Sequence, residues 1–126
     1  MYTLNLGRAF EARHYLVGGD WGPENDPHGH AYRVEVRLEA EELDRHGYIV
    51  DLEKLEDLLD RCVAHYQDRM LNDLAEFSGR NPSIEHFSRC FFDRLAAGLP
   101  PHRFHAIEVR IWENTDAWAS YRGRFR

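Results

Sequence analysis

Three histidines, His14, His28 and His30, stand where they could bind a metal ion together. Alternation of apolar and polar residues predicts that each faces inward near a strand end, and His28 and His30, two residues apart, point the same way. Gly29 between them lets another backbone approach closely. Neutral imidazole is a common zinc ligand, and catalytic zinc sites combine three protein ligands with an open position. We therefore predict a zinc site; the alternative is ordinary core or surface histidines.

Glu113 is a second residue whose position suggests chemistry. It is predicted to end a strand of alternating apolar residues on the buried side, where an ionised carboxylate needs hydrogen-bond donors. A ligand that presents two adjacent N–H groups would supply them in bidentate fashion. In the alternative, Glu113 lies at a solvated strand end and pairs with an arginine. The pattern alone leaves both open.

The elements that must position these side chains are predicted from hydrophobic periodicity. Strands are predicted over residues 2–16 and 28–38, with even positions inward, and over 107–113 and 117–121. The loop between the first two is rich in glycine, proline and acids. Helices are predicted to begin near Asp51 and within Pro82 to Glu85. The order ββααββ predicts an α+β domain with two helices on one face of an antiparallel sheet.

Length and composition narrow the class of protein. The 126 residues suit a single domain spanning 1–126. A net charge of −6, with scattered arginines, argues against a nucleic-acid partner. No apolar run approaches the roughly 20 residues of a membrane span and no leader precedes the first strand, so we expect no membrane partner and a cytoplasmic protein. Cys62 and Cys90 fall in helical patterns and are expected to be core thiols. Open sheet edges predict an oligomer.

Six short motifs occur in an informative order: FEARHYL, HGHAYRVEV, GYIVDLEKL, LND, PSIE and WENT. Together they resemble the 6-pyruvoyl-tetrahydropterin synthase and 6-carboxy-tetrahydropterin synthase family, from about Leu4 to Tyr121. The most specific part is F-x-A-x-H followed by H-G-H. The resemblance implies the tunnelling fold (T-fold), in which three subunits form a barrel and two trimers stack into a homohexamer.

The same resemblance implies roles for single residues. It makes His14, His28 and His30 zinc ligands, and Glu113 the carboxylate that grips the 2-amino and N3 edge of a pterin. Ser83 stands where the family usually has a threonine beside the pterin. In the family, zinc holds the hydroxyls of the substrate side chain and acidifies the adjacent C–H bonds, and a nearby base moves the protons.

Two positions depart from the family pattern. The family's base is a cysteine four residues before H-G-H, and here that position is Glu24. The family's Asp-His dyad lies in D-H-x-x-L-N, whereas this chain reads QDRMLN. A one-residue gap would put Asp68 on the aspartate and Arg69 on the histidine, and His65 on the preceding helix turn is another group that could approach.

A branch of the family with glutamate at this position resembles an aldolase-type lyase that makes 6-hydroxymethyl-dihydropterin for folate synthesis. A glutamate near zinc could deprotonate a side-chain hydroxyl and start C–C cleavage. We therefore predict a zinc-dependent pterin lyase acting on dihydroneopterin or its triphosphate, with Glu24 and Asp68 catalytic. The alternatives are a solvent-facing Glu24, Glu24 as fourth zinc ligand, a pterin carrier or regulator without turnover, and a purely structural zinc protein. The pathway, queuosine, folate or biopterin synthesis, stays open.

Overall fold

The elements of this computed structural model follow the predicted order, and the structure describes residues 1–124. Phe125 and Arg126, the end of the predicted 1–126 domain, lie outside the described residues. The strands and helices are β1 (Tyr2–His14), β2 (His28–Ala40), α1 (Leu52–Tyr66), α2 (Ile84–Ala96), β3 (Ala106–Trp112) and β4 (Trp118–Gly123). Short 3-10 helices lie at Gly22–Asn25, Leu71–Asp73 and Ala75–Phe77. The predicted ββααββ order and α+β class are confirmed.

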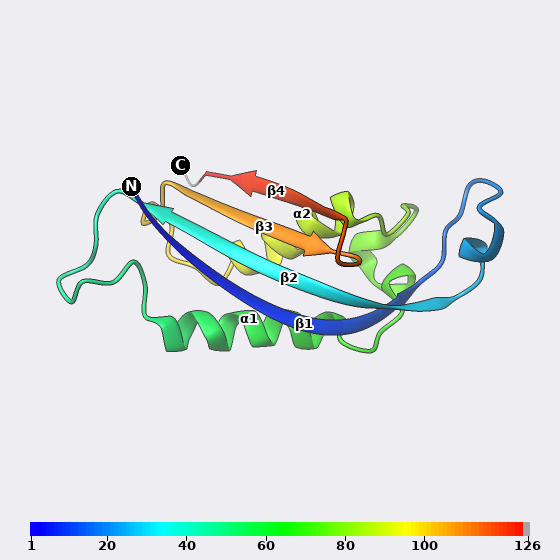
Figure 1. Cartoon of the computed structure of the whole chain (residues 1–126), viewed down its shortest axis with the longest axis horizontal. Helices are drawn as coiled ribbons and strands as arrows, with labels where there is room; N and C mark the ends of the chain where they lie inside the picture. Colours follow the sequence, from blue (N-terminus) through cyan, green and yellow to red (C-terminus); the bar gives the residue numbers. More distant parts are fainter. Residues whose placement is uncertain (125–126) are drawn as a thin grey trace.

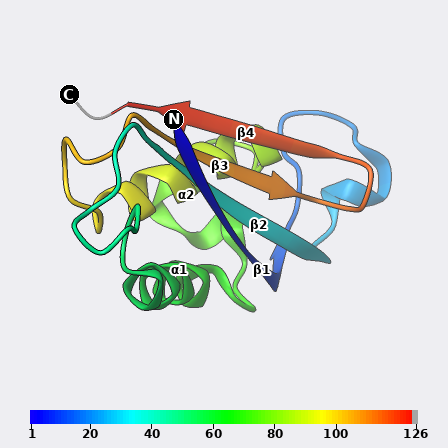
Figure 2. The same cartoon turned by 60° about the vertical axis from the view of Figure 1, so that its left-hand side comes forward.

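The four strands form one antiparallel sheet in the order β1-β2-β3-β4, and both helices cover the same face of it (Figure 1). Helix α1 packs along β1, whereas α2 packs across β3 and β4, so the helices divide the sheet between them (Figure 2). Strands β1 and β2 pair over their full length, from Tyr2 opposite Ala40 to His14 opposite His28. This long hairpin carries the predicted metal ligands to one end of the molecule.

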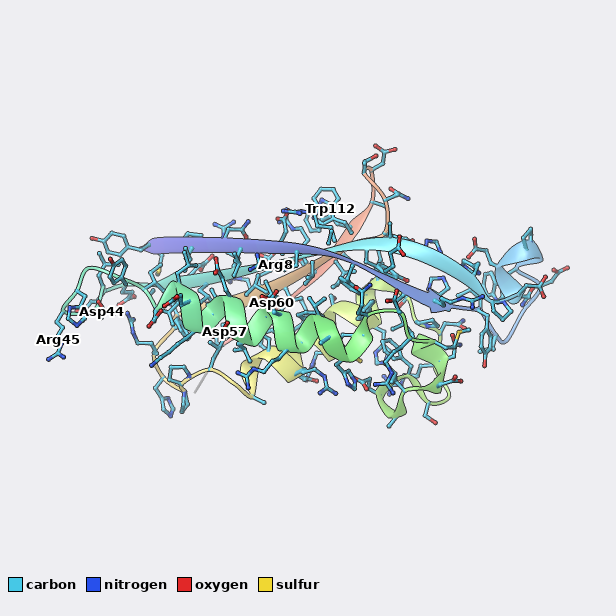
Figure 3. All side chains as sticks on the ribbon, turned by 90° about the horizontal axis from the view of Figure 1, so that it is seen from below. Arg8, Asp44, Arg45, Asp57, Asp60 and Trp112 are labelled. Atoms are coloured by element: carbon cyan, nitrogen blue, oxygen red, sulfur yellow. The ribbon has the colours of Figure 1, made fainter. Side chains whose placement is uncertain are left out.

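The face under the helices is the predicted inward face. On β2 the even positions from Tyr32 to Ala40 are buried, while the odd positions between them are exposed or half-buried. On β1 the same parity holds from Phe10 onward, but Tyr2 is exposed. Arg8 also lies on this face, and its Nε pairs with Oδ1 of Asp60 on α1 at 2.8 Å (Figure 3). The helical stripes pack on this face, and Cys62 and Cys90 are buried, as predicted.

The opposite face of the sheet is polar. Alternating arginines and glutamates pair along and across its strands, as in the contacts of Glu39 with Arg37 and Arg122. The Arg110 guanidinium lies 3.6 Å from the centre of the Trp118 ring, which shields part of that aromatic surface. Among residues 1–124, no helix is both long enough and apolar enough to cross a membrane.

Two strand ends differ from the prediction, and both matter for the site. The first strand was predicted over residues 2–16 but ends at His14, because the next residues leave the sheet and pair with side chains from elsewhere in the chain. Strand β3 ends at Trp112, so Glu113 belongs to the turn that leads to β4 and is not the last residue of the strand.

Candidate metal centre

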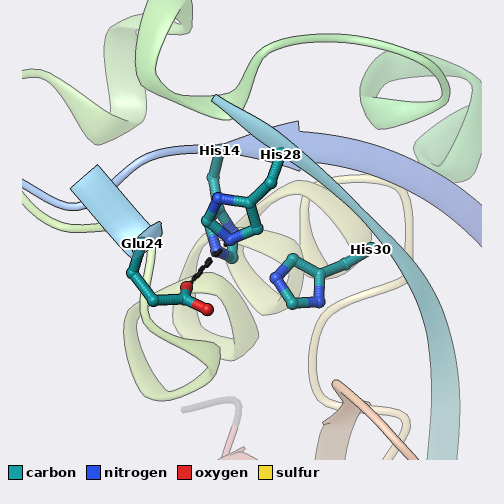
Figure 4. Close-up of side chains that lie close together, drawn as sticks. All are labelled: His14, Glu24, His28 and His30. Atoms are coloured by element: carbon teal, nitrogen blue, oxygen red, sulfur yellow. Dashed lines mark ion pairs between the residues drawn. The ribbon is translucent and has the colours of Figure 1, made fainter. Parts of the chain in front are cut away.

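The three predicted histidines converge with Glu24 at one end of the β1–β2 hairpin. His14 comes from the end of β1, His28 and His30 from the start of β2, and Glu24 from the 3-10 helix between the strands (Figure 4). One nitrogen or carboxylate oxygen from each residue lies within 4.8 Å of those of the other three. This group could hold a metal ion.

The register of the hairpin explains the convergence. His14 and His28 are directly opposite across β1 and β2, and His30 faces Ala12, so the three imidazoles point to the same side. The ring centres of His14 lie 4.5 Å from those of His28 and of His30. His14 is 2% exposed, whereas His28 and His30 are half-buried at the open end of the site.

Hydrogen bonds hold two of the rings by the nitrogen that faces away from the centre. Nδ1 of His28 lies 2.7 Å from the carbonyl oxygen of Asp26. A carbonyl oxygen can only accept, so Nδ1 of His28 carries the proton and Nε2 presents a lone pair to the centre. Nδ1 of His14 lies 2.7 Å from the hydroxyl of Tyr32. Such outer contacts orient metal-binding imidazoles.

The unsatisfied atoms of the centre fit a bound cation. Among residues 1–124, Nε2 of His28 and Nε2 of His30 are buried without a hydrogen-bond partner, which costs free energy. Nε2 of His28 does lie 2.9 Å from Oε2 of Glu24, but the two atoms do not meet in hydrogen-bond geometry. Nitrogen and oxygen atoms directed at a shared third point would have this arrangement. Three imidazoles and a carboxylate suit a transition-metal ion such as zinc.

Two asparagine side chains hold the segment that follows β1. Asn72 accepts a hydrogen bond from the N–H of Tyr15 at 3.0 Å and donates to its carbonyl oxygen at 2.9 Å. Asn81 makes the same pair of contacts with Val17, at 2.8 and 3.1 Å. Because both polar atoms of each carboxamide bind one residue's backbone, the two side chains take the place of a neighbouring strand. We call them the asparagine clamp.

The clamped segment in turn positions Glu24. Between the two clamped residues, the N–H of Leu16 donates to the carbonyl oxygen of Glu24 at 2.8 Å. The side chain of Asn25 donates to the carbonyl oxygen of Leu16 at 3.1 Å. Because the anchoring contact uses the backbone of Glu24, its carboxylate is left to face the histidines. The side chain of Glu24 is 48% exposed, so its carboxylate is accessible from solvent.

Burial keeps His14 in the form that binds metals. The pKa of His14 is lowered from 6.5 to about 4, first by burial and then by the charges that His30 and His28 carry when protonated. His14 is therefore neutral at neutral pH, and a neutral ring has a lone pair for a metal ion.

Glu113 reaches the edge of this centre. Its Oε1 atom lies 3.7 Å from Nε2 of His30, and its side chain is 32% exposed. The side chain recorded nearest to this carboxylate among the ion-pair contacts of residues 1–124 is thus a histidine. A cavity of about 570 Å³ beside Glu113 is lined in part by Tyr32, Trp112 and Asn114.

The two other predicted site residues lie outside the four-residue group. Asp68 has a left-handed backbone (φ 59°), and its N–H donates to the carbonyl oxygen of Glu11 at 2.7 Å. Asp68 and His30 both line a cavity of about 420 Å³. The hydroxyl of Ser83 accepts from the N–H of His86 at 3.1 Å and caps α2. The roles assigned to Asp68 and Ser83 from the sequence stay predictions.

His65 belongs to a separate polar cluster. Its Nε2 atom lies 3.2 Å from Oε1 of Glu76, while Oε2 of the same carboxylate accepts from the hydroxyl of Tyr66 at 2.8 Å. Arg94 also approaches this carboxylate, at 3.4 Å. His65 is thus engaged by Glu76, where the sequence left open an approach to the metal centre.

Sequence reasoning gave no role to three residues that support the centre: Tyr32, Asn72 and Asn81. Tyr32 occupies an inward position of β2, and the alternation of residues along the strand does not predict the hydrogen-bond partner of its hydroxyl. Asn72 lies in the LND motif, which marked it without explaining it. The pairing of Asn81 with Val17 joins residues 64 positions apart, for which no local pattern exists.

Comparison with known proteins finds a matching family model and relatives named for reactions of pterins. A model of the 6-pyruvoyl tetrahydropterin synthase family matches residues 3–124. The 6-carboxy-5,6,7,8-tetrahydropterin synthase of Bacillus subtilis is 25% identical over 127 residues, covering 96% of this chain and 85% of that protein. The dihydroneopterin monophosphate aldolase of Pyrococcus furiosus is 29% identical over 108 residues, covering 86% of each. The solved 6-pyruvoyl tetrahydropterin synthase of Caenorhabditis elegans has a TM-score of 0.84 at 23% identity, over 97% of this chain and 95% of that one, and this likeness confirms the predicted T-fold.

The buried neutral His14 predicts a pH dependence of the metal-free protein. Between pH about 4 and 6.5 the unfolded chain binds a proton at this residue that the folded chain does not, so the free energy of unfolding falls as the pH is lowered through that range. The slope from one such group approaches about 1.4 kcal/mol per pH unit. Urea unfolding of chelator-treated protein at several pH values should show this slope reduced in His14→Gln and kept in His46→Gln, at an exposed histidine. An unchanged slope in His14→Gln would contradict the assignment.

The asparagine clamp predicts a local effect of Asn81→Ala. The variant loses both contacts with Val17, so the amides of residues 15–25 should exchange hydrogen at least about tenfold faster, with a loss of roughly 1 kcal/mol in the free energy of unfolding. Hydrogen exchange read by mass spectrometry checks this. Asn114→Ala is the matched control, because Asn114 accepts from two backbone N–H groups in a different turn. Equal exchange of residues 15–25 in both variants would rule out the clamp.

Proposed function

Because the chain belongs to the 6-pyruvoyl tetrahydropterin synthase family, we propose that it is a cytoplasmic, zinc-dependent lyase that cleaves a C–C bond in the side chain of dihydroneopterin or a phosphate ester of it. The observation that carries the proposal is the convergence of the Glu24 carboxylate with His14, His28 and His30. A carboxylate stands here at the position of the family's cysteine base. The similarity to a dihydroneopterin monophosphate aldolase supports cleavage of the side chain.

Glu113 supplies the pterin contact in this proposal. A pterin offers a ring N–H beside an amino group, and a carboxylate can accept from both at once. The 3.7 Å separation of Glu113 from His30 supports a substrate whose ring meets Glu113 while its side chain extends to the histidines. Ser83 is the proposed second contact with the pterin.

Glu24 is the proposed general base. Zinc held by the three histidines would polarise a side-chain hydroxyl of the substrate and stabilise the negative charge that develops on its oxygen. Glu24 accepts the proton from the hydroxyl on the second side-chain carbon. As that oxygen forms a carbonyl, the bond between the first and second carbons breaks, and its electron pair passes to the first carbon and the conjugated ring. The proton returned to the first carbon completes a 6-hydroxymethyl product and an aldehyde, with no oxidant or reductant required.

Asp68 is proposed to act in the proton transfers with Glu24. It lines a cavity to which His30 also contributes, and this shared cavity supports the assignment. The exposed position of Asp68 in one chain is consistent with a role that is completed when chains assemble.

The contact of Glu24 with the histidines also favours a second function, pterin binding without turnover. Oε2 of Glu24 lies 2.9 Å from Nε2 of His28 and 4.0 Å from Nε2 of His14, so it could serve as a fourth metal ligand. Four protein ligands close a zinc site to substrate. The protein would then bind pterins without turnover, as a carrier or regulator.

Product analysis distinguishes the two functions. Zinc-loaded protein incubated with dihydroneopterin, its monophosphate and its triphosphate should release 6-hydroxymethyl-dihydropterin, identified by mass spectrometry. Glu24→Gln should lower the rate by about 10²–10⁴-fold, the usual contribution of a general base. Asp20→Asn, an exposed acid of the same loop, is the control and should keep the rate.

Each other product has a distinct meaning. A bound but intact pterin would support the carrier, and no bound pterin would leave a structural metal site. A 6-carboxy or 6-pyruvoyl product would mean that the family's other reactions proceed without cysteine, and would point to queuosine or biopterin rather than folate synthesis.

We also propose that the protein is a homohexamer made of two trimers. Strands β1 and β4 are the edges of the four-stranded sheet, and an edge strand presents backbone N–H and C=O groups with which a strand of another chain can pair. Light scattering after size-exclusion chromatography should give the mass of six chains of 14.9 kDa each. A monomer at micromolar concentration would refute this assembly.

A further inference from the structure

We propose that Tyr32 is a positioning residue of the metal centre, whose hydroxyl accepts a hydrogen bond from Nδ1–H of His14 and so keeps Nε2 of that ring turned toward the ion. The inference rests on the metal site of the proposed function, but not on the reaction. The two atoms lie 2.7 Å apart in the buried part of the site. Outer contacts of this kind set both the tautomer and the orientation of a metal-binding imidazole.

The direction of the hydrogen bond follows from the chemistry of the ring. Nε2 of His14 faces the centre, 4.0 Å from Oε2 of Glu24, and a nitrogen that binds a metal carries no proton. The single proton of the neutral ring must then be on Nδ1, which makes Nδ1 the donor and the tyrosine oxygen the acceptor. With the proton on Nε2 instead, the same pair of residues would oppose metal binding.

The tyrosine ring is itself held in the core. Tyr32 is 2% exposed, stacks on Phe10 at 5.5 Å between ring centres, and meets the edge of Phe87 at 5.3 Å. A hydroxyl on a ring packed in this way has little freedom to follow the imidazole. The strand register helps, because Phe10 and Tyr32 are opposite across β1 and β2 on the same inward face.

The ring of His28 is oriented by a backbone group and not by a side chain. Its Nδ1 is bound by the backbone carbonyl of Asp26, two residues away, which no side-chain substitution removes. His14 instead depends on one side-chain oxygen from the neighbouring strand. Tyr32 is therefore a ligand-orienting contact that a single substitution can delete.

The alternative is that Tyr32 only fills space, and phenylalanine separates the two roles. Tyr32→Phe keeps the aromatic ring and removes the hydroxyl. Tyr66→Phe is the matched control, because Tyr66 is also a fully buried tyrosine whose hydroxyl has a partner, the carboxylate of Glu76 at 2.8 Å. That contact lies in the cluster with His65, separate from the metal ligands.

Zinc affinity, measured by competition with a chromophoric chelator at pH 7, is the first test. We expect Tyr32→Phe to weaken zinc binding about 10–100-fold, the range for loss of an outer-shell partner, while Tyr66→Phe stays within about twofold of the unmodified protein. Affinity unchanged in Tyr32→Phe, or lowered equally in both variants, would overturn the proposal. A protein that binds no zinc overturns this inference and the metal site together, whereas zinc binding without pterin turnover removes only the proposed reaction.

A second test needs no variant and so does not depend on how Tyr32→Phe folds. In zinc-loaded protein with ¹⁵N-labelled histidine, NMR should show a protonated Nδ1 in His14, with slow exchange of that proton against water. A His14 ring with no proton on Nδ1, or with zinc on Nδ1, would refute the assignment.

Discussion

The pairing of β1 with β2 is the constraint on which the rest of the molecule depends. Its register puts His14 opposite His28 and turns both toward the helices, along with His30. Side chains alternate between the two faces of a strand, so a slip of one residue would move a ligand to the polar face and also reverse the core. The buried apolar residues of β2, from Tyr32 to Ala40, therefore fix the register that brings the three histidines together.

At this centre the fold buries polar atoms that lack hydrogen-bond partners. Within residues 1–124, two imidazole nitrogens are buried without hydrogen-bond partners, and burial keeps His14 neutral at neutral pH. A cation would convert this cost into binding free energy, because the lone pairs already point inward. The contacts that orient the rings lie on the far side of them and come from a loop carbonyl and a core tyrosine. Rings that are oriented before the ion arrives lose little freedom when it binds.

Local patterns in the sequence were sufficient to predict the elements and the shared side of the three histidines. Alternation along β2 indicated that His28 and His30 share a face. Asp51 and Ser83 marked the starts of the helices, and they are the N-caps of α1 and α2. The end of β1 could not be read in this way. Tyr15, Leu16 and Val17 are residue types common in strands, and distant side chains, those of Asn72 and Asn81, hold the backbone of this segment outside the sheet. The contact of Tyr32 with His14 likewise depends on geometry between two strands.

The asparagine clamp fixes where residue 24 stands without fixing which chemical group its side chain carries. Glu24 is placed through its backbone carbonyl, by a segment that is itself held by side chains 57 and 64 residues away from their partners. No part of this anchoring uses the side chain at position 24. A thiol, a carboxylate or a carboxamide introduced there would start from the same point beside the histidines. The loop therefore presents whatever group stands at position 24 to the three histidines, and that group can change while the backbone contacts of the loop stay the same.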